Sequence, residues 1–192
     1  MSDAAVNPMK AGLEDVVVSP SEICFIDGHK GRLVYRGFDV DELVAQSNFE
    51  EVTYLLWYGK LPTRKELDTH VKALSSTANR KLPPKLIAML KLLPKKTTPM
   101  EVLRTGISAL SAFDPDAADN SREATLRKTI RLTAQMPTLV AAWDRIRRGK
   151  PPVGPNPRLS LAGNFLYMIL PRNACNWASL HPPPRGQQAC VS

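Results

Sequence analysis

The 192-residue sequence predicts a mainly α-helical fold with a small β-hairpin region near its N-terminus. Three observations carry this prediction. Apolar residues recur at helical spacing from about residue 39 to residue 168. Helix start and stop signals separate each periodic segment from the next. The β-prone runs are short and precede the helical part of the chain.

The β-prone runs occupy residues 16–18, 23–26 and 33–35. Residues 27–31 (Asp-Gly-His-Lys-Gly) lie between the last two runs and are typical of turns, so they favour a small hairpin. Cys24 lies within an apolar run, and we expect it to be a small buried side chain. Residues 1–11 come before these runs and are predicted to be a disordered N-terminus.

Helix termini are marked by residues that suit the first or last turn. The start signals are Asp39 as an N-cap, Thr63 with Glu66 as a capping box, and Pro83 with Pro84 in the first turn. The stop signals are Gly59 and Pro94. These signals predict helices at residues 39–45 and 49–58, and two more after Thr63 and Pro83.

The best-marked helix begins after Thr98. Thr98 as N-cap, Pro99 at the first helical position and Glu101 at the third combine two start signals. The apolar stripe predicted for this helix is Met100, Leu103, Ile107 and Leu110. Small residues, among them Gly106, soften its apolar face and favour close packing against another helix.

Two further helices follow. Asn120 with Glu123 is expected to begin a long helix that runs toward Arg148, and Pro137 inside that helix predicts a kink. Residues 160–168 predict the beginning of another helix. Residues 170–192 do not continue the pattern, because Pro171 to Ser192 hold no Asp or Glu and lack helical periodicity. We expect this aberrant tail to be disordered, either as a native tail or as the product of a disrupted reading frame.

The charge and composition exclude several classes of protein. The formal net charge is +8, and eight basic residues lie at residues 121–150, where their spacing scatters them around the polar face of a helix. No zinc-finger spacing or aromatic RNA-binding signature accompanies this charge, so we expect no nucleic-acid partner. No apolar run approaches the length of a transmembrane helix, and we expect a cytoplasmic protein without a membrane partner. The three cysteines show no paired metal-ligand spacing.

The order of several motifs resembles the citrate synthase family. The matching segments are residues 26–28 (Ile-Asp-Gly), 33–38 (Leu-Val-Tyr-Arg-Gly-Phe), 49–63, 99–105 (Pro-Met-Glu-Val-Leu-Arg-Thr), 136–138 (Met-Pro-Thr) and 159–168. The resemblance implies that residues 12–169 form the N-terminal part of a citrate synthase-like helical large domain. It also implies a homodimer of the intact enzyme, which condenses acetyl-CoA with oxaloacetate in the tricarboxylic acid cycle.

No catalytic, cofactor-binding or metal-binding residue is predicted in this chain. In the family, the catalytic residues lie in His-Ala-Asp-His-Glu, Gly-Pro-His-Gly-Gly and later segments, which come after the helix that contains Met168. The three histidines here, His29, His70 and His181, lack the flanking residues of those segments. We therefore expect the chain alone to be inactive and to hold no cofactor, acetyl-CoA being a co-substrate of the intact enzyme.

Two alternatives remain open at this point. The family includes 2-methylcitrate synthases, which use propionyl-CoA, and the acyl pocket that separates the two activities lies outside the matching segments. The second alternative is a non-catalytic helical protein, which would bind a full-length synthase or a second copy of itself through its small-residue helices.

Overall fold

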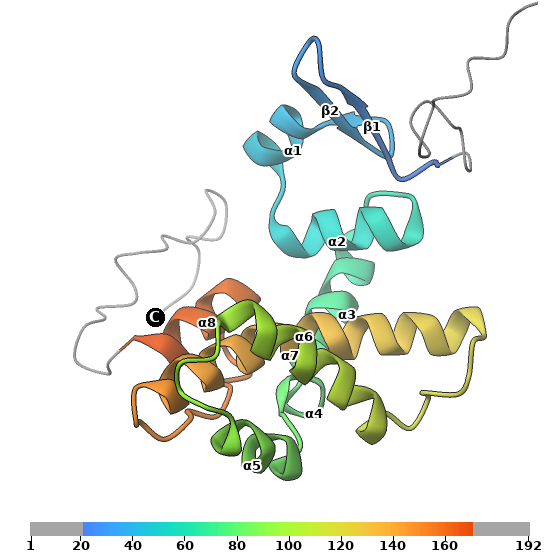
Figure 1. Cartoon of the computed structure of the whole chain (residues 1–192). Helices are drawn as coiled ribbons and strands as arrows, with labels where there is room; N and C mark the ends of the chain where they lie inside the picture. Colours follow the sequence, from blue (N-terminus) through green and yellow to red (C-terminus); the bar gives the residue numbers. More distant parts are fainter. Residues whose placement is uncertain (1–20, 171–192) are drawn as a thin grey trace, which may run out of the picture. The chain divides into compact units, whose positions relative to one another are not determined.

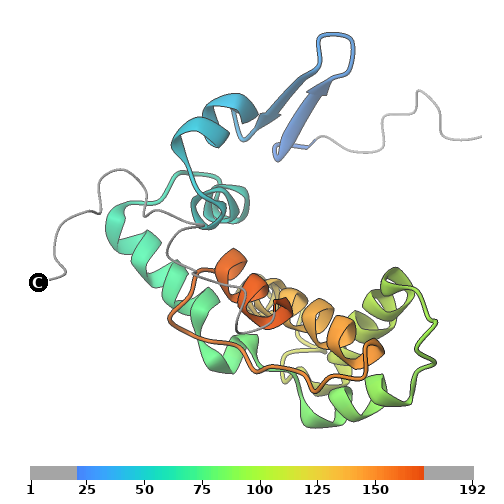
Figure 2. The same cartoon turned by 90° about the vertical axis from the view of Figure 1, so that its left-hand side faces the viewer.

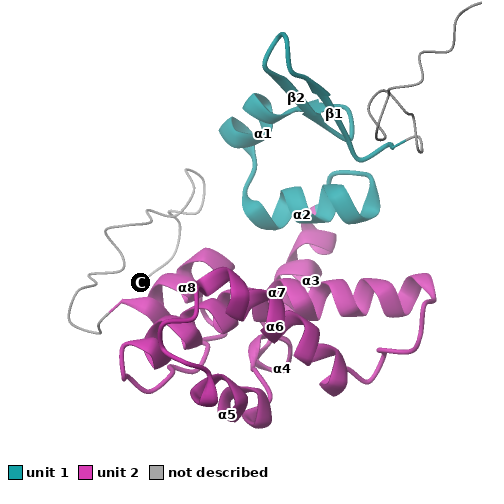
Figure 3. Ribbon diagram, viewed as in Figure 1, with its two compact units in different colours: residues 1–63 teal, residues 64–192 magenta. Residues whose placement is uncertain are grey.

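The computed structural model describes residues 21–170, which fall into two compact units (Figures 1 and 3). Unit 1 ends at Thr63 and unit 2 begins at Arg64. The predicted disordered N-terminus at residues 1–11, the β-prone run at residues 16–18 and the tail from Pro171 onward lie outside the described residues. No helix among the described residues combines the length and apolar character needed to cross a bilayer.

Unit 1 contains a three-stranded antiparallel sheet in the order β1-β2-β3, comprising Cys24–Asp27, Arg32–Tyr35 and Phe38–Asp39. The predicted hairpin between β1 and β2 is confirmed, and Asp27 Oδ1 accepts a hydrogen bond of 3.0 Å from the Lys30 backbone N–H in its turn. The short strand β3 was not predicted. It forms because Arg36 and Gly37, with φ of 49° and 91°, turn the chain back along β2.

The expectation that Cys24 is buried is wrong, because its side chain is exposed. Its neighbours on either side share this exposure, with Phe25 58% and Ile23 50% exposed. β1 pairs only with β2 among the described residues, and both of its faces stay open to solvent. An apolar run at the edge of a small sheet therefore does not imply burial here.

Helices α1 (Val40–Gln46) and α2 (Phe49–Tyr58) complete unit 1. Asp39 stands at the predicted N-cap position of α1, but its side chain forms no capping bond. The reason is competition: the Asp39 carboxylate accepts two hydrogen bonds from Arg32, at 2.8 and 3.0 Å. Asn48 and Glu51 form a capping box for α2, which ends at Gly59 with φ of 77°, as Gly59 predicted.

Unit 2 is helical and is built around one long helix, α7 (Arg122–Arg147). The others are α3 (Arg64–Ser75), α4 (Thr77–Arg80), α5 (Pro84–Leu92), α6 (Pro99–Leu110), the 3₁₀ turn η1 (Ser111–Phe113) and α8 (Leu161–Ile169). All five of these α-helices contact α7, and Figures 1 and 2 show α8 lying along it. The largest buried core residues are Leu82, Leu86, Leu90, Val102, Leu110, Leu139, Trp143 and Ile146.

The start of α6 is confirmed as predicted, since Thr98 and Glu101 form a capping box. The predicted apolar stripe is partly wrong, because Met100 is 71% exposed. The fully buried side of α6 instead consists of Val102, Gly106 and Leu110, which recur every four residues. This spacing places the glycine, rather than a larger side chain, where α6 meets α7.

The start of α7 differs by one residue from the prediction. Ser121, not Asn120, is the N-cap, and its Oγ accepts a hydrogen bond of 3.3 Å from the Ala124 backbone N–H. Serine and asparagine are both good N-cap residues, so adjacent copies make the choice ambiguous in a sequence. The helix continues through Pro137 without interruption, and the kink at that residue stays a prediction.

A Gly106→Ala substitution tests the close packing of α6 against α7. A Cβ at residue 106 would lie 2.8 Å from Leu139 Cδ2, and Leu139 is only 1% exposed and has little room to move. We expect the overpacking to exceed the gain in helix propensity and to lower the free energy of unfolding by about 1 kcal/mol in urea denaturation.

Two controls separate the packing effect from a general effect of alanine. Gly154→Ala should be nearly neutral, because no atom lies within 4 Å of the added Cβ and the φ of Gly154 is not positive. In a Leu139→Ala background the clash disappears, so Gly106→Ala should become neutral or stabilising. Equal destabilisation by Gly106→Ala in both backgrounds would contradict the packing explanation.

Candidate functional site

The histidines do not assemble a site in the described residues. His29 is exposed in the turn of the hairpin in unit 1, whereas His70 is 4% exposed on α3 of unit 2. His181 lies outside residues 21–170. Within those residues, no group of three or more His, Cys, Asp or Glu side chains could hold a metal ion.

The guanidinium of Arg80 in unit 2 is 1% exposed and forms several hydrogen bonds to backbone carbonyls. Its Nε donates to the carbonyl oxygen of Leu74 at 2.8 Å. Its Nη1 donates to the carbonyls of Asn156 and Leu159, both at 2.9 Å. Arg80 therefore joins the end of α3 to the loop that precedes α8.

A buried amide on α8 fixes the same loop from the other side. Asn164 is fully buried, and its Oδ1 accepts a hydrogen bond of 2.7 Å from the Asn156 backbone N–H. Ser160 caps α8 by accepting 3.1 Å from the Gly163 backbone N–H. Asn156 is thus held through both its carbonyl oxygen and its backbone N–H, which orients the start of α8.

An ion-pair cluster holds the connection between α6 and α7. Arg131 contacts Asp114 and Asp116, both at 2.6 Å, and Arg127 contacts Asp116 at 2.7 Å. The hydrogen bonds from Arg127, followed by those from Arg131, hold the pKa of Asp116 well below its ordinary value of 3.8. The sequence analysis placed these two arginines on a solvated helix face. Their ion pairs show that they also anchor the loop between α6 and α7.

The C-terminal end of α7 forms a cavity with the loop that follows it. Gly149 has φ of 71°, and the backbone N–H groups of Gly149 and Lys150 donate to the carbonyls of Ile146 and Arg145, at 2.9 and 2.8 Å. This is the hydrogen-bond pattern of a Schellman motif. It turns the chain sharply and brings Lys150 back to the last turns of the helix.

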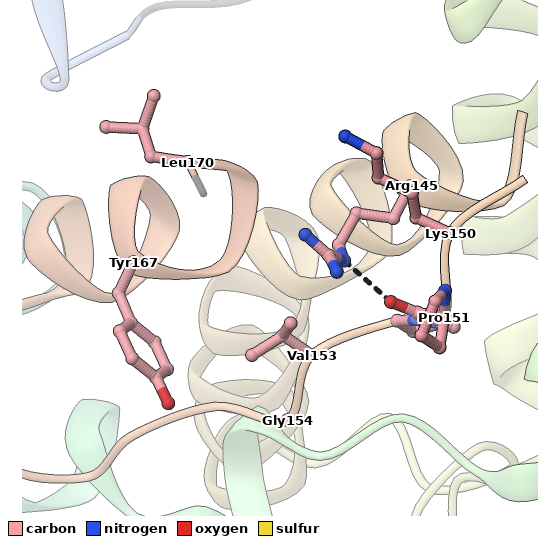
Figure 4. A pocket seen from close by; sticks show the side chains of 8 residues that line it. Arg145, Lys150, Pro151, Val153, Gly154, Tyr167 and Leu170 are labelled. Carbon is pink, nitrogen blue, oxygen red and sulfur yellow. Dashed lines mark hydrogen bonds between the residues drawn. The ribbon is translucent and has the colours of Figure 1, made fainter. Parts of the chain in front are cut away.

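We call this cavity the α7-end cavity; its volume is about 540 Å³. Its lining residues are Arg145, Lys150, Pro151, Pro152, Val153, Gly154, Tyr167 and Leu170. Figure 4 shows Tyr167 of α8 on one side, Arg145 and Lys150 on the other, and Val153 between them. Arg145 Nε donates to the Pro151 carbonyl at 2.6 Å, which fixes the orientation of the guanidinium.

Comparisons with known proteins identify the family. A family model described as "Citrate synthase, C-terminal domain" matches residues 12–180. The citrate synthase of Haloferax volcanii is 44% identical over 166 residues, covering 84% of this chain and 43% of that protein. A 2-methylcitrate synthase of Mycobacterium tuberculosis is 41% identical over 160 residues, covering 83% of this chain and 40% of that protein.

Solved structures agree with the sequence comparisons. The citrate synthase from Pyrobaculum aerophilum superposes with a TM-score of 0.77 at 36% identity, covering 87% of this chain and 43% of that one. The chain therefore belongs to the citrate synthase family. Its mostly helical fold with a small N-terminal sheet is the one found in the solved citrate synthases. The chain spans less than half the length of the relatives that it matches.

Sequence reasoning found no site residues and missed the two polar assemblies that organise unit 2. Arg80 was not recognised as a buried residue, because the four-residue helix α4 (Thr77–Arg80) is too short to show periodicity. Neither Asp114 nor Asp116 was predicted to form an ion pair. The available signal was the Asp-Pro-Asp sequence, followed at a distance by arginines four residues apart on one helix face.

Arg80→Met tests whether the buried guanidinium holds the loop before α8. The substitution removes the donors while keeping much of the side-chain volume, so three carbonyl oxygens lose a partner. We expect the free energy of unfolding to fall by about 3 kcal/mol. Lys85→Met, which removes one cation from an exposed position, is the matched control and should change it by less than about 0.5 kcal/mol. Similar effects of both substitutions would refute the role assigned to Arg80.

The Asp116 ion pairs predict a specific pH dependence of stability. The pKa of Asp116 is depressed in the folded state, so the unfolded state takes up this proton first as the pH falls. The stabilisation is fully present above about pH 5 and is lost below it, toward the depressed folded-state pKa. In urea denaturation, Asp116→Asn should lose less free energy of unfolding between pH 5 and pH 3 than the unchanged chain. Glu123→Gln, which removes a nearby carboxylate on α7, should keep the full decrease.

Proposed function

We propose that this chain supplies the N-terminal, helical part of the large domain of a citrate synthase. The complete enzyme would condense acetyl-CoA with oxaloacetate and hydrolyse the thioester, releasing citrate and CoA. The observation that carries this proposal is the citrate synthase family match over residues 12–180, supported by the 44% identity to the citrate synthase of Haloferax volcanii.

The proposal assigns the 192 residues a scaffolding role and no activity of their own. The reaction needs a positioned base for the acetyl methyl proton and fixed donors for the negative charge that develops. His29 is exposed and His70 is buried in another unit, and neither lines the α7-end cavity. Arg80 and Asn164 are deeply buried polar side chains of unit 2; they form hydrogen bonds to the backbone of the loop before α8, and neither lines the α7-end cavity.

Exposed apolar side chains support a homodimer for the complete enzyme. Met100 is 71% exposed and Leu92 is 86% exposed, and Phe113 and Met136 are each more than 40% exposed. Such residues favour association when they lie together on a surface. We further propose that the complete enzyme works in the cytoplasm.

A 2-methylcitrate synthase is the second candidate for the complete enzyme. The relative from Mycobacterium tuberculosis with that name is 41% identical, close to the 44% of the Haloferax citrate synthase. A Bacillus subtilis relative carries both names, "Citrate/2-methylcitrate synthase", at 36% identity. The two candidates differ in the acyl-CoA substrate, so assays with acetyl-CoA and propionyl-CoA distinguish them.

An activity assay of the purified 192-residue chain tests the scaffolding role. The chain is incubated with oxaloacetate and acetyl-CoA or propionyl-CoA, and the CoA and tricarboxylate products are quantified by chromatography. We expect product formation equal to the buffer blank, while the Haloferax citrate synthase serves as the positive control. Product that increases with the concentration of the chain would refute the absence of activity and leave the family assignment intact.

Two further experiments examine the larger proposal. Translation of the coding DNA beyond residue 168 in all three frames should yield a continuation with a His-Ala-Asp-His-Glu-like segment. If no frame does so, the helical interaction protein becomes the better hypothesis. That alternative predicts a mixed dimer when the chain is combined with an intact synthase, which native mass spectrometry detects.

A further inference from the structure

We propose that the α7-end cavity binds a small organic anion, with its charged oxygens at Arg145 and Lys150 and its carbon skeleton against Val153 and Leu170. The volume of about 540 Å³ lies in the range of small-molecule sites. Two of the eight lining residues are cations, and none is Asp or Glu. The lining therefore attracts negative charge without an acidic group of its own to neutralise it.

The guanidinium of Arg145 is oriented but not saturated. Its Nε is committed to the Pro151 carbonyl at 2.6 Å, so the group is held in the loop (Figure 4). Its terminal nitrogens have no other hydrogen-bond partner or ion pair within residues 21–170. A planar guanidinium fixed at one nitrogen can present its remaining N–H groups to a carboxylate or phosphate with little loss of conformational entropy.

Lys150 adds the second cation through the turn at the end of α7. The Schellman motif bonds its backbone N–H to the Arg145 carbonyl, which keeps the two residues together. Its exposed side chain makes no ion pair among the described residues. The two cations therefore share one rim of the cavity because of a backbone constraint and not through a chance approach of surface side chains.

The nearest acidic residue on the helix does not compete for these cations. Asp144 Oδ1 pairs instead with Arg147 at 3.2 Å and with Arg148 at 3.0 Å. The sequence that follows Leu170 contains no Asp or Glu, so it supplies no side-chain carboxylate either. Charge complementarity thus favours a separate anionic ligand.

The rest of the lining indicates an organic ligand rather than a bare inorganic ion. Val153, Leu170 and two prolines form an apolar wall, and Tyr167 stands opposite the cations. The Tyr167 hydroxyl makes no hydrogen bond within the described part of the chain. It is available as a donor to a second oxygen of the ligand, while its ring extends the apolar surface.

Binding measurements with two probes test this inference on the full 192-residue chain. Benzoate carries a carboxylate on an apolar ring, and inorganic phosphate carries charged oxygens without a carbon skeleton. Isothermal titration at constant ionic strength should show saturable binding of benzoate, with phosphate at least about tenfold weaker. Lys150→Gln should weaken benzoate binding by about tenfold, and Arg145→Gln by at least as much.

Matched controls make each outcome decisive. Lys91→Gln removes one cation from an exposed position on α5 and should leave benzoate affinity within about twofold. Lys150→Gln replaces an exposed side chain that forms no hydrogen bond or ion pair within residues 21–170, so the circular dichroism spectrum should be unchanged, which excludes misfolding as the cause of weaker binding. Equal losses of benzoate affinity in the Lys91→Gln and Lys150→Gln variants would mean that the net charge of the protein, and not the cavity, determines binding, which would contradict the proposal. Absence of saturable benzoate binding to the unchanged chain would overturn the proposal, as would phosphate binding as tightly as benzoate.

Discussion

The architecture of unit 2 depends on a single buried cation, the Arg80 guanidinium. Removing a charge of this kind from water costs several kcal/mol, so it is tolerated only where fixed polar groups replace the lost hydration. Three backbone carbonyls do so, one at the end of α3 and two in the loop before α8. Segments nearly eighty residues apart in the sequence are thereby joined at one point. Arg80 is the last residue of the short helix α4, which places its side chain at this junction.

Polar contacts also fix the connections at both ends of α7. At its N-terminal end two arginines neutralise two aspartates of the preceding loop, and at its C-terminal end backbone groups close a Schellman turn. Arg127 and Arg131 of the basic segment are therefore balanced by Asp114 and Asp116 and add nothing to the local net charge. Basic residues that cluster in a sequence can form ion pairs within the protein. A high net charge alone therefore does not indicate a nucleic-acid-binding surface.

Local signals predicted the helices well and the tertiary contacts poorly. Thr98, Pro99, Glu101 and Gly59 act over three or four residues, so their effects are visible in the sequence and were confirmed. The prediction that Asp39 caps α1 with its side chain was wrong, because its carboxylate binds Arg32 of the neighbouring strand instead. This contact depends on the sheet register, which local sequence signals do not reveal. The predictions that Met100 and Cys24 lie on buried apolar faces were wrong, because an apolar residue is buried only if another element covers it. Arg80 was missed since nothing in its immediate sequence marks a charge as buried.

The exposed thiol at the edge of the small sheet affects how association of this protein has to be measured. Cys24 lies on a strand whose outer edge is unpaired in the described residues, within reach of a second molecule. Air oxidation could join two chains covalently there without any folded interface between them. A band of double mass in a non-reducing gel would then report thiol chemistry, so subunit composition is meaningful only when it is determined in the presence of a reductant.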